Sequence, residues 1–542
     1  MKIRLFTIVI AIVTVCYNAA AQHVLPPPIP GNLTLTGTET FTVAGTDTGV
    51  ASGIISGAGI LQKLGTGTLV LSGINTYSGG TLLDAGAILI GSNTALGTWS
   101  AGDPDITKNG MLSIIGTNNS GTIKVLDDRT ITNHFQLGKP GTYPSDVGAD
   151  RTGALAFNIE QGKTLTITSV ENISTDNYLR NGGAINVNVP SADGTASSLT
   201  FGNPSSPSGN LMFSDNKSNR YGGAVGAYFN GADQHSVLDF RGLDSIVFSG
   251  NIAGSTSGEG GGIFSSSSSS SSVSVGDNAT FSDNIAANAG QGNGGGIFSS
   301  SVSSYSSPSS SSSSVSVGNN ATFSGNIAGN ASSGEGGGIF SISNSYYASS
   351  SVSVENYATF SGNTAGNAGL GGGYGGGIYS HSLSNYYTSS SVSVGNYATF
   401  SGNTAGIGDG YGGAIVSWGS NGCVTVENHA YFTNNRARGG SNSVGYGGAI
   451  FTYTDITLSG NTFFEGNLVS NCATSLGGAI YLGLTTSAKI ALLNATGGDI
   501  AFSGNKVGVD MTGVNPTGGT ANSIHLDENK RFDITGGGQR LL

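Results

Sequence analysis

Carboxylates and basic side chains are the groups in this chain that could perform hydrolase or lyase chemistry. Catalysis on a polysaccharide would need two or three acids converging on one groove, with a Lys or Arg, or a calcium ion, to stabilise the charged transition state. The acidic candidates are Asp103 and Asp105, Asp127 and Asp128, and Asp239 near Arg241 and Asp244. None recurs in register or belongs to a recognisable motif, and short acidic pairs in turns usually cap backbone amides. We therefore expect no catalytic residue and no enzyme.

Metal and cofactor sites have no better support in the sequence. The histidines are isolated and lack the spacing of zinc ligands; they are His134, His235, His381, His429 and His525. Gly408-Asp409-Gly410 matches a calcium-binding nonapeptide turn only weakly. The glycines from Gly371 to Gly377 follow a repeat instead of opening a helix, as a phosphate loop would. We expect no metal and no cofactor.

A double repeat organises most of the chain instead. Gly-Gly-small-aliphatic tetrapeptides recur every 30 to 42 residues and end at Ile185, Val225, Ile263, Ile297, Ile339, Ile378, Ile415, Ile450 and Ile480. Phe-x-x-Asn units alternate with them and begin at Phe213, Phe248, Phe281, Phe323, Phe360, Phe400, Phe432, Phe464 and Phe502. A period of this length indicates stacked supersecondary units rather than one globular core.

Each repeated residue type has a physical role in such a stack. Paired glycines suit a corner with positive φ where a Cβ would clash with the next coil, and the aliphatic residue after them would begin an inward-facing strand. Valines two apart, such as Val273 and Val275, share one face. The Asn of each Phe-x-x-Asn would tolerate left-handed angles and hydrogen-bond its equivalents in adjacent coils, as an internal amide ladder. The sequence thus predicts an all-β parallel β-helix, a solenoid with columns of Val and Phe inside it.

Low-complexity segments interrupt the repeat. The Ser-rich stretches from Ser265 to Ser272 and from Ser299 to Ser314 are predicted to be flexible exposed loops, because a polar tract cannot pack a core. In later repeats, the matching place is occupied by the tyrosine pairs Tyr346-Tyr347 and Tyr386-Tyr387. For these pairs, the alternative to a flexible loop is an exposed contact surface. At about 20 to 25 residues per coil and ~4.8 Å of rise, the chain would form a rod on the order of 100 Å long.

Composition and the first thirty residues limit the compartment and the partners. A basic start, an apolar stretch and Ala19-Ala20-Ala21 predict a signal peptide over residues 1–21, and the prolines predict a stiff spacer over residues 22–31. No later apolar run reaches the ~20 residues of a spanning helix. A formal charge of -11 disfavours nucleic-acid binding. Cys423 and Cys472 do not make a disulfide framework.

Two stretches resemble known families. Residues 57–91, with Asn75-Thr76-Tyr77-Ser78-Gly79-Gly80, resemble the autotransporter-associated β-strand repeat, which implies an exported right-handed β-helix passenger. They belong to an expected N-terminal β-helical unit, residues 32–164. Residues 165–542 form a second unit whose repeats resemble those of chlamydial polymorphic outer membrane proteins.

The second resemblance depends on two motifs that occur together. They are Gly-Gly-Ala-Ile (Gly412, Gly413, Ile415; Gly447, Gly448, Ile450; Gly477, Gly478, Ile480) and Phe-x-x-Asn (Phe281, Asn284; Phe323, Asn326; Phe360, Asn363; Phe400, Asn403; Phe502, Asn505). The resemblance implies a type V autotransporter passenger whose repeated motifs are associated with adhesion to host cells. Members of that family continue into a C-terminal β-barrel, whereas this chain stops at Leu542 without such a strand series, so contact with the outer membrane would need a missing or separate barrel.

The leading functional hypothesis is therefore an exported adhesin, at the outer membrane surface or secreted, whose partner is a host cell-surface protein or glycan. The first alternative is a structural stalk whose repeats mediate self-association. The second alternative is a β-helical polysaccharide-degrading enzyme.

Overall fold

The structure is a computed structural model. It describes residues 22–25, 29, 31–99, 111–114, 119–138, 153–172, 182–189, 198–203, 205–206, 208–229, 235–302, 310–345, 347–366, 372–383, 388–406, 408–440, 442–470, 472–483, 490–495, 498–511, 517–527 and 531–535. These residues form strands and no helix, so none of them lies in a helix long and apolar enough to cross a membrane. The expected signal peptide, Asp103, Asp105, Tyr346, Tyr386 and Tyr387 lie outside the described residues.

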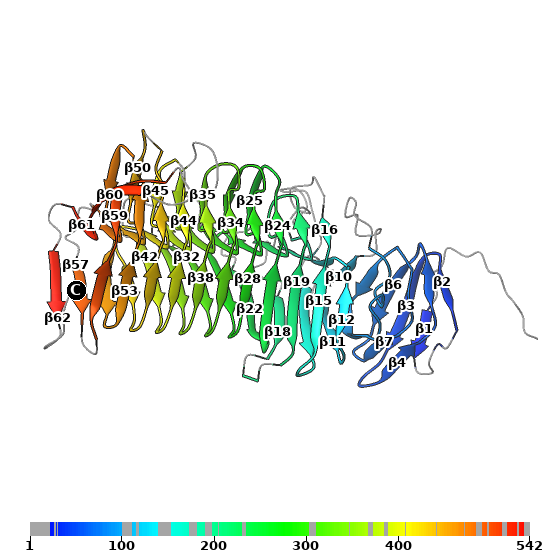
Figure 1. Ribbon diagram of the computed structural model, residues 1–542. Helices are drawn as coiled ribbons and strands as arrows, with labels where there is room; N and C mark the ends of the chain where they lie inside the picture. The colour runs from blue at the N-terminus through cyan, green and yellow to red at the C-terminus, as the bar shows by residue number, and fades with distance from the viewer. Residues whose placement is uncertain are drawn as a thin grey trace, which may run out of the picture.

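The described chain is a parallel β-solenoid, elongated along its axis (Figure 1). One coil of the repeat region runs through five strands before it returns one level higher. These are β26 (Ile263–Ser267), β27 (Ser270–Val275), β28 (Thr280–Ser282), β29 (Ile285–Ala286) and β30 (Gln291–Asn293), followed by β31 (Ile297–Val302) in the next coil. The predicted fold class, an all-β parallel solenoid, is confirmed.

Equivalent strands of successive coils pair into long sheets. The 16-stranded sheet contains β1 (Gln22–Leu25), β3 (Thr38–Val43), β6 (Ile60–Leu64), β8 (Thr81–Leu83), β10 (Leu112–Ile114), β13 (Phe135–Leu137), β17 (Ile185–Val189), β21 (Val225–Phe229), β26, β31, β36 (Ile339–Asn344), β41 (Ile378–Ser382), β46 (Ile415–Trp418), β51 (Ile450–Thr452), β56 (Ile480–Leu482) and β61 (Ile524–Leu526). The 15-stranded sheet runs from β4 (Thr48–Ala51) through β27, β32 (Ser310–Val317), β37 (Tyr347–Val354) and β42 (Ser389–Val394) to β62 (Arg531–Thr535).

Three narrower sheets complete the longer coils of the repeat region. The Phe sheet has 11 strands, from β12 (Arg129–Ile131) through β28, β33 (Thr322–Ser324) and β38 (Thr359–Ser361) to β58 (Ile500–Ser503). A further 11-stranded sheet runs from β16 (Glu171–Asn172) to β60 (Thr517–Ala521), which pairs antiparallel with β59 (Lys506–Asp510). The outer sheet contains β25 (Ser257–Glu259), β30, β35 (Gly334–Glu335), β40 (Gly373–Tyr374), β45 (Gly410–Tyr411), β50 (Val444–Tyr446) and β55 (Thr474–Leu476).

Coil length changes along the rod, which corrects the expected dimensions. Twenty residues separate the paired positions Leu61 and Thr81, but 42 separate Ile297 and Ile339. The longer coils of the repeat region contain the outer sheet and extended strands in the two large sheets. Sixteen stacked strands at ~4.8 Å therefore span roughly 70 Å rather than 100 Å. The 16-stranded sheet crosses the expected unit boundary at residue 165 without interruption.

The start of the solenoid also differs from the expected spacer. β1 pairs in parallel with β3, and Ile29 bridges to Ala51. The described residues that carry these contacts thus belong to the first coil. The backbone of β1 completes the edge of the 16-stranded sheet, and Ile29 pairs at the edge of the 15-stranded sheet.

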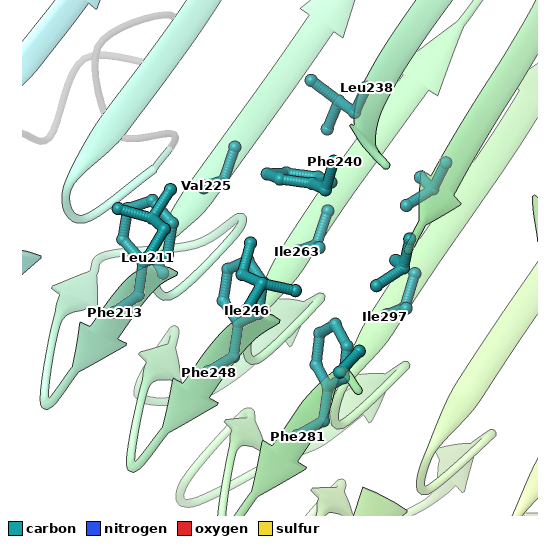
Figure 2. Close-up of a cluster of buried hydrophobic side chains, with 14 of the residues drawn as sticks. Leu211, Phe213, Val225, Leu238, Phe240, Ile246, Phe248, Ile263, Phe281 and Ile297 are labelled. Atoms are coloured by element: carbon teal, nitrogen blue, oxygen red, sulfur yellow. The ribbon is translucent and has the colours of Figure 1, made fainter. Parts of the chain in front are cut away.

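The core is a set of parallel side-chain columns. Figure 2 shows Phe213, Phe248 and Phe281 in line from three successive coils, beside Ile263 and Ile297 of the 16-stranded sheet. Their side chains are 0% exposed. The alternation of the strands places every second residue inward, so the inward positions of Val and Ile predicted from the sequence are confirmed.

The serine tracts are not loops where they are described. Ser265, Ser271, Ser299 and Ser313 are strand residues and are at most 1% exposed. The 16-stranded and 15-stranded sheets extend beyond the apolar core here, and their facing serines hydrogen-bond alternately across the interface. The expectation of exposed loops is wrong for these strands, because a hydroxyl both donates and accepts and can therefore be satisfied by a second serine strand.

The hydroxyl contacts form one continuous chain. It links Ser236, Ser265, Ser271, Ser299, Ser313, Ser341, Ser350, Ser380, Ser390, Ser417 and Thr454, with oxygen–oxygen distances from 2.6 to 3.2 Å. Several of the same hydroxyls also donate to backbone carbonyls, as Ser313 does to Ser299 O at 2.9 Å.

Replacing Ser313 with alanine is expected to lower the free energy of unfolding by about 1 to 3 kcal/mol, because Ser299 and Ser341 lose a buried hydrogen-bond partner. Ser312 on the same strand is exposed, so Ser312→Ala is the matched control and should change stability by less than about 0.5 kcal/mol. Hydrogen exchange of the coils around Ser313 measures the local stability of both variants, because unfolding of a long solenoid need not be two-state. Equal stability of the two variants would contradict a buried serine interface.

Candidate binding surface

The glycine corners place the predicted tetrapeptides inside the wall of the solenoid. Gly412 has φ +56°, and a Cβ on Gly413 would lie 2.3 Å from Gly448 O. Ile415 begins β46 and is fully buried. The same arrangement recurs at Gly447, Gly448 and Ile450 and at Gly477, Gly478 and Ile480. Backbone of the next coil therefore occupies the space that a side chain would need.

The Asn of each Phe-x-x-Asn forms the amide ladder that the sequence predicts. Nδ2 of each residue donates to Oδ1 of the next at 2.9–3.0 Å along Asn216, Asn251, Asn284, Asn326, Asn363, Asn403, Asn435, Asn467 and Asn505. The ladder residues themselves do not have positive φ, which corrects one expectation. The residue before each of them does, as with Asp283 (φ 55°) and Gly325 (φ 63°).

The phenylalanines of the same motif stack directly. Ring centroids along Phe213, Phe248, Phe281, Phe323, Phe360, Phe400, Phe432, Phe464 and Phe502 are 4.7 to 5.0 Å apart. Phe281, Phe323, Phe360 and Phe400 are 0% exposed, as are Asn284, Asn326, Asn363 and Asn403. These motif residues hold the coils in register, and a partner on the surface cannot touch those buried side chains.

The acidic candidates mostly stabilise turns. Asp127 pairs with Arg129 at 3.1 Å, and Asp128 accepts from Thr164 N at 2.8 Å. Asp239 pairs with Arg241 at 2.7 Å; burial raises the pKa of Asp239, but the hydrogen bonds and charge of Arg241 outweigh burial and leave that pKa lowered.

One shallow groove of about 450 Å³ does collect acids, at the corner between the 15-stranded sheet and the Phe sheet. Arg241, Asp244, Asp277 and Glu355 line it. Asp244 accepts from Gly209 N at 3.1 Å and Asp277 from Asn319 N at 2.7 Å. These two carboxylates thus satisfy backbone amides of neighbouring coils, which is the capping role expected for turn acids.

Histidine side chains are held by aromatic neighbours. His134 is buried against Trp99, and burial lowers its pKa to about 4. Burial likewise lowers the pKa of His381 to about 4 beside the Tyr379 hydroxyl. His429 stacks on Tyr397 and His525 on Tyr481. Of His235, only the backbone is described.

Within the described ranges, no three His, Cys, Asp or Glu side chains are grouped closely enough to hold a metal ion. Cys423 and Cys472 are both free and partly exposed, and the described part of the molecule holds no disulfide framework.

A surface that the sequence analysis did not single out runs along the outside of the repeat region. The outer sheet presents one residue per coil, immediately before each Gly-Gly pair. These form the corner column: Tyr221, Glu259, Asn293, Glu335, Tyr374, Tyr411, Tyr446 and Leu476, in direct register. In Figure 1 the outer-sheet strands β25, β35, β45 and β50 lie in a row along the upper edge.

A second column faces the first from the 16-stranded sheet. The residue after each inward Ile or Val points outward, and this strand column contains Phe264, Phe298, Phe340, Tyr379, Val416, Phe451 and Tyr481. These side chains are 0 to 6% exposed, because the corner column and the half-buried Ile342, Trp418 and Tyr453 cover them. The two columns and these covering residues are called the outer aromatic surface below.

Ring contacts make this surface continuous. Tyr374 stacks on Tyr411 at 4.8 Å, Tyr446 on Tyr481 at 4.5 Å, and Trp418 meets Tyr453 edge-on at 4.9 Å. Such rings present large, rigid area at low entropic cost, and Tyr and Trp are enriched at protein interfaces. The arrangement is therefore suited to binding rather than to chemistry.

Three polar residues of the corner column separate Tyr221 from the rings that begin at Tyr374. Glu259 and Glu335 lie in register on either side of Asn293, and both are half-buried. Burial raises the pKa of each carboxyl to about 7, and the charge of Glu259 raises that of Glu335 further. Carboxylates with shifted pKa values beside aromatic rings at the surface are candidates for ligand contact.

A sequence signal for this surface did exist. An aromatic residue follows the tetrapeptide Ile at Phe264, Phe298, Phe340, Tyr379 and Phe451, and a Tyr precedes Gly-Gly at Tyr374, Tyr411 and Tyr446. Of the tyrosine pairs that the sequence analysis noted instead, only Tyr347 is described, and it is 43% exposed.

Comparisons with known proteins agree with an exported passenger. Residues 61–90 match the family model of the passenger-associated-transport-repeat, within the stretch 57–91 identified above. The chain is also 29% identical over 215 residues to the adhesin BmaC autotransporter of Brucella suis biovar 1 (strain 1330). That similarity covers 37% of this chain and only 6% of the relative's length. No solved structure matches the chain.

Proposed function

We propose that this protein is an exported autotransporter-type passenger that acts as an adhesin, and that its outer aromatic surface contacts a protein or glycan on a host cell. The observation that carries the proposal is the outer aromatic surface itself, which extends over the coils from Tyr221 to Tyr481. The passenger repeat and the similarity to an autotransporter adhesin support it. The motif resemblance to chlamydial polymorphic outer membrane proteins points the same way.

The proposal includes export through the inner membrane to the outer membrane surface or the medium, and no enzymatic activity. Asp128, Asp244 and Asp277 accept hydrogen bonds from backbone amides of turns, which supports a structural role for these acids rather than a catalytic one. The low content of charged residues and the net charge of -11 disfavour nucleic acid as the partner.

Cell binding should fall at least tenfold in the triple variant Tyr374→Asn, Tyr411→Asn, Trp418→Ser, because the ring area is lost. The fold already holds these smaller residues at equivalent positions, Asn293 in the corner column and Ser300 in register with Trp418. Flow cytometry of labelled residues 22–542 on cultured epithelial cells measures the effect, with thermal unfolding as the check on folding.

The matched control is the double variant Tyr357→Asn, Tyr397→Asn. These tyrosines are 56% and 45% exposed, stack on each other at 4.9 Å, and lie at the corner that follows the 15-stranded sheet. Asn320 occupies the equivalent corner with φ 58°, so the control should fold and bind cells as the wild type does. Equal binding by the triple variant and the wild type would refute the proposed surface. Absence of saturable cell binding, together with concentration-dependent self-assembly, would favour the stalk alternative.

A further inference from the structure

The first five residues of the corner column have the same residue types when read in either direction. Tyr221, Glu259, Asn293, Glu335 and Tyr374 occupy five successive coils in register. The column therefore contains two junctions between a carboxylate and a tyrosine ring, one at each end of the polar segment. Because neighbouring coils are ~4.8 Å apart, each ring lies within reach of a cation that its neighbouring carboxylate attracts.

The chain itself supplies a cation at the first junction. The Arg220 guanidinium lies 4.5 Å from the centroid of the Tyr221 ring. Its charge also favours the ionised form of Glu259, opposing the effect of burial on that pKa. A cation over an aromatic face beside a carboxylate is a stabilising combination, and arginine is preferred for it because its planar group stacks.

The second junction has the same acceptor groups and lacks the cation. Glu335 lies in register beside Tyr374, which is the end ring of the Tyr374–Tyr411 stack, and Tyr379 stacks on Phe340 below them. Within the described residues, the charged groups that act on this place are the acids Glu259 and Asp409. The buried Oδ1 of Asn293, one coil away, has no hydrogen-bond partner in the described structure.

The sequence around this junction is depleted of positive charge. No Lys or Arg occurs between Arg241 and Arg436, whereas that stretch contains Asp244, Glu259, Asp277, Asp283, Glu335, Glu355, Asp409 and Glu427. The coils that present the second junction are thus uniformly acidic, and a partner complementary to them is basic.

We propose that the Glu335–Tyr374 junction is a binding site for an arginine side chain of a basic polypeptide segment on the partner. This inference rests on the proposed function and names the chemistry of the ligand. The guanidinium takes the place over Tyr374 that Arg220 takes over Tyr221, its charge is balanced by the Glu335 carboxylate, and Asn293 Oδ1 is available as an additional acceptor.

The site is expected to respond to pH. Burial raises the pKa of Glu335 to about 7, so the carboxylate that attracts the guanidinium is ionised above that value and protonated below it. Affinity should therefore fall about tenfold between pH 8 and pH 6. Folding stability changes in the opposite sense, because the folded-state pKa is raised. The contribution of Glu335 to stability is present at low pH and is lost as pH rises from about 4.5 to about 7.

The test uses purified residues 22–542 and a tetra-arginine peptide, by isothermal titration at pH 8 and low ionic strength. Glu335→Gln should raise Kd at least tenfold, and Tyr374→Leu at least threefold. Glu355→Gln is the matched control, since it removes the same charge from a neighbouring corner outside the outer aromatic surface; its Kd should stay within twofold of wild type. The Tm of the Glu335→Gln variant at pH 8 should be no lower than that of the wild type, so weaker binding cannot be attributed to unfolding.

A second experiment tests whether removing Arg220 creates an additional peptide-binding site. Arg220→Gln removes the internal cation, and the freed Tyr221–Glu259 junction should bind a second peptide, raising the stoichiometry from one to two. Equal weakening by Glu335→Gln and Glu355→Gln would show a diffuse charge effect and overturn the site, as would absence of saturable binding by the wild type. Wild-type adhesion to cells without peptide binding would reject this inference alone, whereas peptide binding without cell adhesion would reject the proposed function and leave the site standing.

Discussion

Replacing Asn326 with alanine is expected to lower the free energy of unfolding by about 3 to 5 kcal/mol. Its Nδ2 donates to Phe281 O at 2.8 Å and to Asn363 Oδ1 at 2.9 Å. Its Oδ1 accepts from the side-chain Nδ2 of Asn284 at 2.9 Å and from the backbone N of Asn284 at 3.2 Å. Alanine removes all four bonds and leaves buried polar groups of the adjacent coils without partners, each costing about 1 to 3 kcal/mol. The loss should be local, since a solenoid coil contacts mainly its neighbours.

Hydrogen exchange read by mass spectrometry is the appropriate measurement, because unfolding of a long solenoid need not be two-state. Protection should decrease in the coils around Asn284, Asn326 and Asn363 and stay unchanged near Leu61. Asn288→Ala is the control, as Asn288 is exposed and its side-chain Oδ1 accepts a long, 3.3 Å hydrogen bond from Asn330 Nδ2. Uniform exchange in Asn326→Ala and wild type would show that the amide ladder does not hold the coils.

Replacing Gly337 with alanine should be the most damaging single change, costing about 4 kcal/mol or more. The added Cβ would lie 2.3 Å from Gly376 O and 2.6 Å from Thr364 N. Both are backbone atoms of the next coil, so no side-chain rotation can relieve the overlap. The coil above must shift, which would break the register of the 16-stranded sheet and of the outer sheet together. Loss of soluble protein, or a large fall in Tm, is the expected result.

Two neighbouring glycines provide the controls for this prediction. Gly338→Ala should cost less than about 1 kcal/mol, because alanine already occupies the equivalent position at Ala414, Ala449 and Ala479. Gly362→Asp should also be tolerated, because a Cβ added at Gly362 would meet no atom within 4 Å. The φ of Gly362 is +62°, and Asp283 adopts a φ of 55° at the equivalent position. If Gly337→Ala were as stable as Gly338→Ala, coil-to-coil contact at the corner could not be the reason for the paired glycines.

The amide ladder and the paired glycines matter for function because they fix the register of the residues on the outer aromatic surface. The residue before each Gly-Gly pair enters the corner column and the residue after the Ile enters the strand column. A shift of one coil would separate Glu335 from Tyr374 as well as breaking the ladder. Adhesion and stability are therefore coupled in interior variants and separable in surface variants such as Glu335→Gln.

Local patterns were sufficient to predict the solenoid and its interior. Strand alternation decides which residues face inward, and a fixed repeat length brings like residues into register, so the buried Ile, Val and Phe columns and the amide ladder follow from spacing alone. The turn caps made by Asp128 and Asp244 were also predictable, because capping is a contact with nearby backbone.

Only the tertiary structure revealed the buried serine interface and the outer aromatic surface. Ser265 and Ser271 look like loop residues by composition, and only the close approach of two serine strands gives each hydroxyl a partner. Phe340 and Tyr379 point away from the core, and the fold of the outer sheet against them turns an outward stripe into a surface with Glu335 in its middle. Both outcomes depend on which strands meet across the coil, a non-local contact that no sequence period encodes.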